Sequence, residues 1–244
     1  MRNKSYYGNL CSLFYDASNG FACEQEVAFY EKHISAHGKV LEAMCGSGRL
    51  LIPLLERGHS VDGVDASSAM LARCHERCAA LQLKPMVYEQ SLETLVLASR
   101  YQTVIIALGS FQLITDRVVA VQILQNLHAH MDQGGDLFID IFVPEVTSTE
   151  LATRELPVAD GSIIRLTTRY VINEQTKIAD ALCEYERVVS GQITAQEHEL
   201  IRVTWYSDAE LRMLLEDAHF ELIAIYDEPF GLDVAARVVH ARAL

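Results

Sequence analysis

VLEAMCGSGRLL, residues 40–51, runs from an apolar strand through a turn of small residues into the start of a helix. Small residues in such a turn let a ligand approach the backbone closely, and N–H groups at the start of the helix face that ligand. The segment therefore predicts a site for a nucleotide-sized ligand. A dinucleotide fingerprint starting at Gly46 would have its third glycine where Leu51 stands, and a P-loop would need a Lys-Ser/Thr pair after Gly48. The segment therefore matches neither of these phosphate-binding motifs.

Two carboxylates flank this turn. Glu42 comes before it, and Asp65 ends the next predicted strand. A carboxylate at a strand end can accept charge-assisted hydrogen bonds from both hydroxyls of a ribose. The two acids are poor neighbours for a pyrophosphate, so they predict a cationic or hydroxyl-bearing ligand.

Apolar runs alternate with helical patterns around the turn. An amphipathic helix is predicted over Glu24–His37, before the first strand. Strands are predicted over Lys39–Glu42, Ser60–Asp65, Pro85–Glu89, Thr103–Leu108 and Asp136–Phe142, with helices over Arg49–Arg57, Ser68–Ala80, Ser91–Ala98 and Arg117–Met131. This alternation is typical of βαβ units, so we expect an α/β fold with a doubly wound, mostly parallel sheet.

The pattern changes after Pro144. Three alternating segments joined by turn-prone residues predict an antiparallel β-meander, namely Ser162–Ile172, Ala181–Val189 and His198–Tyr206. A capping box, Ser207 with Glu210, opens a predicted helix over Asp208–His219, and strands over Phe220–Tyr226 and Arg237–Ala243 follow. We expect a core formed by residues 1–146 and 207–244, interrupted by an inserted antiparallel sheet at 147–206.

Composition limits the partners. At roughly 150 residues per domain, 244 residues with 50% hydrophobic side chains predict one large domain or one domain with an insertion. The net charge is −13, from 20 Lys+Arg and 33 Asp+Glu, so no nucleic-acid partner is expected. The longest apolar stretch, Val104–Ile114, is too short to span a bilayer, and the start MRNKSYYGNL has no apolar signal region. We expect no membrane association and a cytoplasmic location.

The six cysteines are scattered and include no C-x-x-C pair, so reduced thiols are expected. Cys74 and Cys78, with His75 beside them, lie on one predicted helix face and make only half of a metal site. No metal is expected.

The two acids and the glycine turn together resemble class I S-adenosylmethionine-dependent methyltransferases. Their first motif is a strand, an acid and G-x-G-x-G, and their second is the strand-end acid seen here in VDGVDASSAML, residues 61–71. The resemblance covers nearly the whole chain and implies a Rossmann-like sheet of seven strands, an N-terminal lid and S-adenosylmethionine as cofactor. The meander resembles the insertion of small-molecule methyltransferases such as sugar N-methyltransferases, which implies an enzyme with a small-molecule methyl acceptor.

The resemblance also implies the site residues. For the cofactor these are Tyr15, Glu42, Met44, Cys45, Gly46, Gly48, Asp65, Ala66, Met70, Gln90, Ser91, Leu92 and Leu108. The acceptor pocket lies outside the carboxyl ends of the fourth and fifth strands. It is implied to include Gly109, Ser110, Phe111, Gln112 and Glu145. For Met70 and the lid aromatics, packing on the core remains the alternative role.

Three positions depart from the family pattern. Met44 stands where the first glycine is common, Ser91 where an acid often accepts a hydrogen bond from adenine, and Leu113 where many relatives have a histidine. The expected base is therefore missing and no catalytic residue is assigned. The open candidates for a proton acceptor are Asp140, Glu145, Tyr6 and Tyr7. These departures keep open a non-catalytic S-adenosylmethionine-binding protein, whereas a nicotinamide-dependent oxidoreductase would need the missing third glycine.

The meander presents two faces. Arg165 and Arg169 share one face by period two, and they either bind an anionic group of the acceptor or pair with the acids Glu184, Glu186 and Glu199 on a solvated face. The opposite face packs on the domain or on a second subunit in a homodimer. It carries Ile164, Leu166 and Tyr170.

Overall fold

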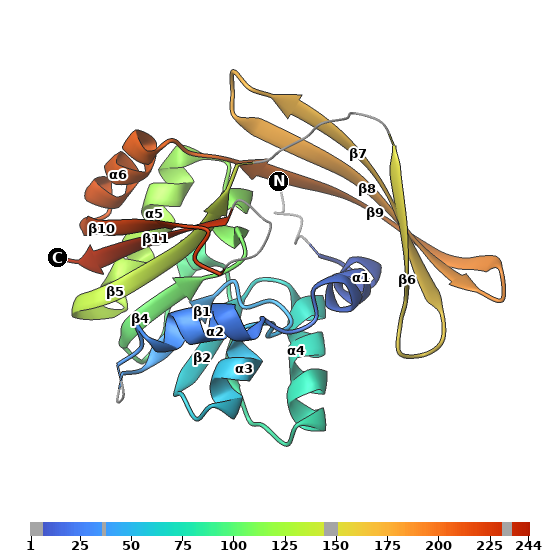
Figure 1. Ribbon diagram of the computed structural model, residues 1–244, viewed down its shortest axis with the longest axis horizontal. Coiled ribbons are helices and arrows are strands. Elements are labelled where there is room, and N and C mark those ends of the chain that lie inside the picture. Colours follow the sequence, from blue (N-terminus) through green and yellow to red (C-terminus); the bar gives the residue numbers. More distant parts are fainter. Residues whose placement is uncertain (1–6, 36–37, 144–150, 231–235) are drawn as a thin grey trace.

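The computed structural model describes residues 7–35, 38–143, 151–230 and 236–244, and within them the chain forms two sheets (Figure 1). The larger sheet has seven strands in the order β10-β11-β5-β4-β1-β2-β3. Its strands are β1 (Val40–Ala43), β2 (Val61–Asp65), β3 (Met86–Glu89), β4 (Tyr101–Ile106), β5 (Met131–Phe142), β10 (Phe220–Asp227) and β11 (Ala236–Ala243). Neighbours among β1 to β5 pair in parallel, and β11 is antiparallel to β5 and β10. The predicted seven-stranded, mostly parallel sheet is confirmed.

Helices cover both faces of this sheet. One face packs against α2 (Glu24–Glu31), α3 (Leu51–Glu56) and α4 (Ser68–Ala80), and the other against α5 (Arg117–Ala129) and α6 (Asp208–Asp217). Burial from both sides explains why the parallel strands are nearly continuous apolar runs. None of the described helices is long and apolar enough to cross a bilayer.

Local capping signals fix two helix starts. The side chain of Ser67 accepts a hydrogen bond from the Met70 backbone N–H at 3.2 Å, and α4 has the predicted bounds. Ser207 and Glu210 form both hydrogen bonds of the predicted capping box at the start of α6.

Two helix predictions are corrected. The segment Ser91–Ala98 contains only the 3-10 turn η1 (Leu92–Thr94), because the Gln90 amide bonds both the N–H and the C=O of Val96 and closes the segment into a loop. Helix α2 ends at Glu31, well before the predicted end at His37, which lies outside the described residues.

The second sheet is antiparallel, in the order β6-β7-β8-β9, and it confirms the meander. Its strands are β6 (Ala152–Pro157), β7 (Ile163–Asn173), β8 (Ile178–Val189) and β9 (Gln192–Thr204), of which β6 was not predicted. On the outward face, Arg165 pairs with Glu155 at 2.7 Å and with Glu186 at 3.0 Å. Glu199 lies on the opposite face, opposite Cys183 in the register, so its predicted pairing with these arginines is wrong.

Helix α1 (Asn9–Asn19) lies between the two sheets (Figure 1). Its apolar side chains Leu10, Cys11 and Phe14 form one buried cluster with inward-facing side chains of the second sheet, Ile164, Cys183 and Tyr185. Ile164 therefore packs against the N-terminal helix of the same chain.

Candidate functional site

The glycine loop, residues 44–50, leaves the carboxyl end of β1 and leads into α3. Its backbone is left-handed at three positions, with φ of 61° at Met44, 54° at Gly46 and 80° at Gly48. A Cβ at Gly48 would lie 2.9 Å from the Cys74 Sγ atom, so α4 packs directly against the loop. Glycine is needed here for both conformation and space.

Asp65 joins the glycine loop to the start of α4. Its carboxylate accepts a 2.8 Å hydrogen bond from the Gly46 N–H and a 2.7 Å hydrogen bond from the Ser67 N–H. Burial raises the pKa of Asp65, and these backbone bonds oppose the rise. A carboxylate has about four acceptor positions, so both oxygens keep capacity for ligand hydroxyls.

A buried polar cluster lies beside the loop and consists of Glu26, Tyr30, Glu42, Arg49 and Asp140. Arg49 forms a two-pronged ion pair with Glu26, at 2.7 and 2.5 Å. Glu42 is 3% exposed, and its Oε2 atom has no hydrogen-bond partner among the residues that the structure describes. Burial is the main reason that the pKa of Glu42 rises to about 8. An unpartnered buried carboxylate is costly, so this atom marks a place for a cationic or donor group of a ligand.

Asp140, an open candidate for a proton acceptor, belongs to this cluster. It lies near the end of β5, accepts a hydrogen bond from the Tyr30 hydroxyl, and accepts another from the Leu108 N–H at 2.7 Å. Burial raises its pKa to about 7. Asp140 therefore fixes the chain after β4, where the acceptor pocket was predicted.

The sequence interpretation missed Glu26, Tyr30 and Arg49 as neighbours of the site. Glu26 and Tyr30 are four residues apart on α2, so they share the helix face that also buries Val27. The sequence feature that could have indicated this site is a charged residue, Glu26, on the otherwise apolar face of α2.

The lid, helix α1, covers the loop and Asp65. Arg49 lies near Tyr15, where its charge opposes the rise that burial gives to the pKa of Tyr15, and the Tyr15 ring meets the Tyr7 ring edge-on with centroids 5.8 Å apart. The Ser67 hydroxyl donates to the Tyr7 carbonyl at 2.9 Å. Predicted as a lid residue, Tyr15 thus lies at the site, accompanied by Tyr7.

Two carboxylates of β9 hold the start of the lid. Glu197 accepts hydrogen bonds from the N–H groups of Leu10 at 3.0 Å and Cys11 at 3.2 Å. Glu199 accepts from Tyr7 at 3.2 Å and from Gly8. The second sheet therefore supplies the cap that α1 lacks locally, since Gly8 has no side chain.

The predicted acceptor residues differ in what they can offer a ligand. Phe111 is 1% exposed and Gln112 is 0% exposed. The Gln112 amide donates to the carbonyls of Phe142 and Thr204 and accepts from the Phe142 N–H, so it joins β5 to β9. Gly109 has φ of 68° and sits against the Phe142 ring. For Gly109 and Ser110 a place in the acceptor pocket stays a prediction, with the Ser110 hydroxyl donating to the Ala107 carbonyl, and Glu145 lies outside the described residues.

The remaining cofactor predictions are spread around Asp65. Met70 is 4% exposed and faces Gly46, whereas Ala66 is exposed. Gln90 uses its amide on Val96, as described above, and Ser91 caps the turn η1, in which Leu92 is buried. Cys45 is buried, and Leu108 is 45% exposed.

The described residues hold no group of three or more His, Cys, Asp or Glu side chains placed to bind a metal ion. Cys74 and Cys78 are buried thiols of α4.

The fold and this site resemble those of α/β methyltransferases. Residues 40–135 match the family described as "Methyltransferase domain". Two proteins named as methyltransferases are similar in sequence: one from Bacillus subtilis (strain 168), 20% identical over 135 residues, and one from Geobacillus sp. (strain WCH70), 25% identical over 203 residues. The alignments cover 55% and 81% of this chain, and 55% and 82% of those proteins, so the chain spans about half the length of the Bacillus relative.

Solved structures share the fold over nearly the whole chain. A S-adenosylmethionine-dependent methyltransferase from Clostridium acetobutylicum ATCC 824 has a TM-score of 0.77 at 16% identity, covering 94% of this chain and 96% of that one. The sugar N-methyltransferase KedS8 from Streptoalloteichus sp. ATCC 53650 has a TM-score of 0.75 at 18% identity, covering 98% and 97%. Residues 40–135 thus match a methyltransferase domain, and the predicted mostly parallel α/β fold is confirmed.

Proposed function

We propose that the chain transfers a methyl group from S-adenosylmethionine to a small-molecule acceptor by in-line displacement. S-adenosylmethionine as the methyl donor follows from the class of the domain, and the acceptor and the geometry of transfer are the proposal. One observation carries it: the buried Glu42 carboxyl, whose Oε2 atom has no partner among the described residues, and Asp65 flank a loop that is left-handed at Met44, Gly46 and Gly48.

The residues fit this cofactor. The orphaned Oε2 atom of Glu42 suits the ammonium group of the methionine part, and Asp65 suits the ribose hydroxyls. When bound, the cofactor supplies an activated methyl group on a sulfonium. The chain's part is to align the two reactants and to exclude water, and the lid with Tyr7 and Tyr15 is placed to do this.

An amine acceptor is supported by the charge of the buried polar cluster. Three carboxylates, of Glu26, Glu42 and Asp140, face the single guanidinium of Arg49. Glu26 is paired with Arg49 and Glu42 is assigned to the cofactor, so Asp140 is the carboxyl left for the acceptor, and its pKa of about 7 suits proton uptake from an amine near neutral pH. KedS8, whose structure is similar, is a sugar N-methyltransferase, which agrees with this choice.

Calorimetric titration tests the ligand. S-adenosylhomocysteine is expected to bind and NAD is not, and binding of NAD alone would contradict the proposal. Asp65→Ala is expected to weaken S-adenosylhomocysteine binding by about 1.5–3 kcal/mol, the range for hydrogen bonds to a charged group. The matched control is Glu89→Ala, an exposed acid at the end of β3. Binding without methyl transfer to any amine of a broad panel would favour the non-catalytic alternative.

A further inference from the structure

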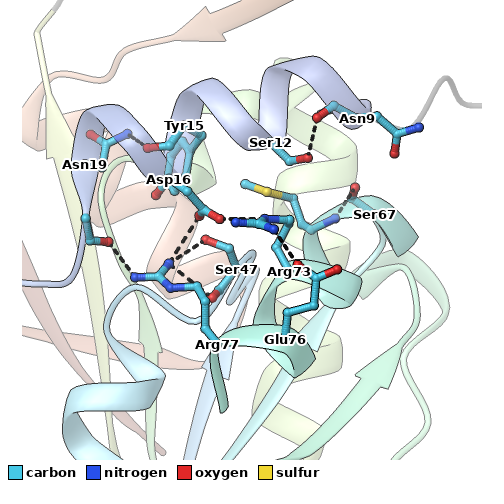
Figure 2. A network of polar contacts seen from close by, with 12 residues as sticks. Asn9, Ser12, Tyr15, Asp16, Asn19, Ser47, Ser67, Arg73, Glu76 and Arg77 are labelled. Atoms are coloured by element: carbon cyan, nitrogen blue, oxygen red, sulfur yellow. Dashed lines mark hydrogen bonds and ion pairs between the residues drawn. The ribbon is translucent and has the colours of Figure 1, made fainter. Parts of the chain in front are cut away.

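A second set of charged contacts holds the far end of the lid, outside the cofactor residues described so far (Figure 2). Arg77 of α4 donates to Asp16 Oδ1 at 3.2 Å and to the Gly20 carbonyl at 2.9 Å, at the end of α1. The same guanidinium donates to the Ser47 hydroxyl at 3.0 Å and to the Ser47 carbonyl at 3.3 Å. One side chain thus binds both the lid and the glycine loop.

The site of these contacts is enclosed. Ser47 is 0% exposed, and it lies between Gly46 and Gly48 at the centre of the loop. The Arg77 and Asp16 side chains are 13% and 11% exposed, and the Arg77 guanidinium carbon lies 3.9 Å from the centre of the Phe21 ring. Little solvent screens this ion pair, so its geometry matters more than that of a surface pair.

Arg73 provides an internal comparison. It lies one helical turn before Arg77 on α4 and donates to the other oxygen of Asp16, at 2.9 Å. Arg73 also donates to Glu76 of the same helix. Figure 2 shows both arginines converging on Asp16, with Arg77 alone reaching Ser47. Arg73 therefore holds the lid to α4, whereas Arg77 also holds it to the loop.

We infer that Arg77 is a positioning residue that couples closure of the lid to the conformation of the glycine loop. A ligand that orders the loop fixes both Ser47 oxygens where Arg77 binds them, and the same guanidinium then holds Asp16, next to Tyr15. The lid must separate from Arg77 before the spent cofactor leaves. This inference rests on the proposed function, because it needs the loop to bind the cofactor.

The test compares Arg77→Met with Arg73→Met, using S-adenosylhomocysteine on the immobilised full chain in surface plasmon resonance. Each variant removes one ion pair with Asp16; Arg73→Met also removes the pair with Glu76 of the same helix, and Arg77→Met also removes the contacts with Ser47 and with the Gly20 carbonyl. We expect dissociation about tenfold faster for Arg77→Met, and within about twofold of the wild type for Arg73→Met. Arg77→Lys, which keeps a charge for Asp16 but lacks the planar fork, should dissociate nearly as fast as Arg77→Met.

Limited proteolysis separates positioning from a merely structural role. The ligand should suppress cleavage within α1 in the wild type and in Arg73→Met, and should fail to do so in Arg77→Met. A structural role would instead raise cleavage equally with and without ligand. If Arg77→Met does not fold, Ser47→Ala tests the inference instead. It should speed dissociation of S-adenosylhomocysteine about threefold in the wild type but leave the rate unchanged in the Arg77→Lys background.

These experiments distinguish failure of the proposed function from failure of the inference about Arg77. A wild-type chain that binds no S-adenosylhomocysteine contradicts the proposed function itself. A wild type that binds, with equal dissociation rates for the two methionine variants or no effect of Ser47→Ala, overturns the coupling role of Arg77 and leaves the proposed function standing.

Discussion

Met44 has a left-handed backbone, with φ of 61°, at the position where the family pattern commonly has glycine. The conformation costs a non-glycine residue about 1–2 kcal/mol, and the partly buried Met44 side chain offsets this by packing against the core. Met44→Ala loses the packing and keeps the strain, whereas Met44→Gly loses both. We expect Met44→Gly to be more stable than Met44→Ala by about 1 kcal/mol in urea unfolding. The reverse order would show that the backbone at residue 44 is not held left-handed.

Glu42 predicts a pH dependence. Its pKa in the folded chain is about 8 against an ordinary value of 4.5, so the folded chain keeps a proton that the unfolded chain loses between these pH values. The contribution of Glu42 to the free energy of unfolding therefore falls as pH rises through this window. Glu42→Gln lacks this loss, so its stability relative to the wild type should rise by about 1–3 kcal/mol from pH 5 to pH 8 without ligand.

Thermal unfolding across this pH range measures the Glu42 effect, with the exposed Glu89→Gln as the control. Glu42→Gln should also bind S-adenosylhomocysteine more weakly, because the charge that suits the ammonium group is gone. A stability difference that does not change with pH would mean that Glu42 is ionised in the folded chain.

At the scale of elements, α1 depends on β9 for its cap. Glu197→Ala leaves the N–H groups of Leu10 and Cys11 without their acceptor, which should cost about 0.5–2 kcal/mol and loosen the lid. Protease cleavage within the first ~25 residues should then be faster, and S-adenosylhomocysteine should slow it. The control is Gln196→Ala, on the outward face of the same strand, where the side chain bonds Glu186. Equal cleavage of the two variants would remove Glu197 as the cap of α1.

The same elements show how far sequence reasoning reaches. The bounds of α4 and the start of α6 follow from local capping by Ser67 and Ser207, and both were predictable. The cap of α1 was not, because Glu197 is 187 residues from Leu10 in the chain. Likewise, the Tyr30–Asp140 contact joins residues 110 apart. The glycine loop and Asp65 could be predicted because their motif is local, whereas the buried polar cluster depends on how α2 packs on the sheet.

For the whole molecule, the position of α1 between the two sheets couples them. Ile164 is 0% exposed against α1, while Leu182 on the outward face of the same sheet is 39% exposed. Ile164→Ala should cost about 2–5 kcal/mol in urea unfolding and weaken S-adenosylhomocysteine binding severalfold, although Ile164 is not a cofactor residue. Leu182→Ala should do neither, and unchanged affinity in a folded Ile164→Ala chain would show that the second sheet does not influence the lid.

The oligomeric state belongs to this scale and stays a prediction. The homodimer was predicted as one role of the face that carries Ile164, Leu166 and Tyr170; on this face Ile164 packs against α1, whereas Tyr170 is 37% exposed. Sedimentation of the wild type and of Tyr170→Lys would check the prediction, since a charge on this face should shift a dimer to monomer.

The burial of Cys11 makes its rate of alkylation a measure of how often α1 separates from the second sheet. Cys11 is 1% exposed, its Sγ atom lies 3.2 Å from the Tyr185 hydroxyl, and burial raises the pKa of its thiol, so alkylating reagents cannot reach it while α1 is seated. Cys23, just beyond α1, is only half-buried and should be labelled at once. The labelling rate of Cys11, followed by mass spectrometry, would then report how often α1 separates from the second sheet. Divided by the rate for the same peptide in denaturant, it gives the fraction of time that the unmodified molecule spends open.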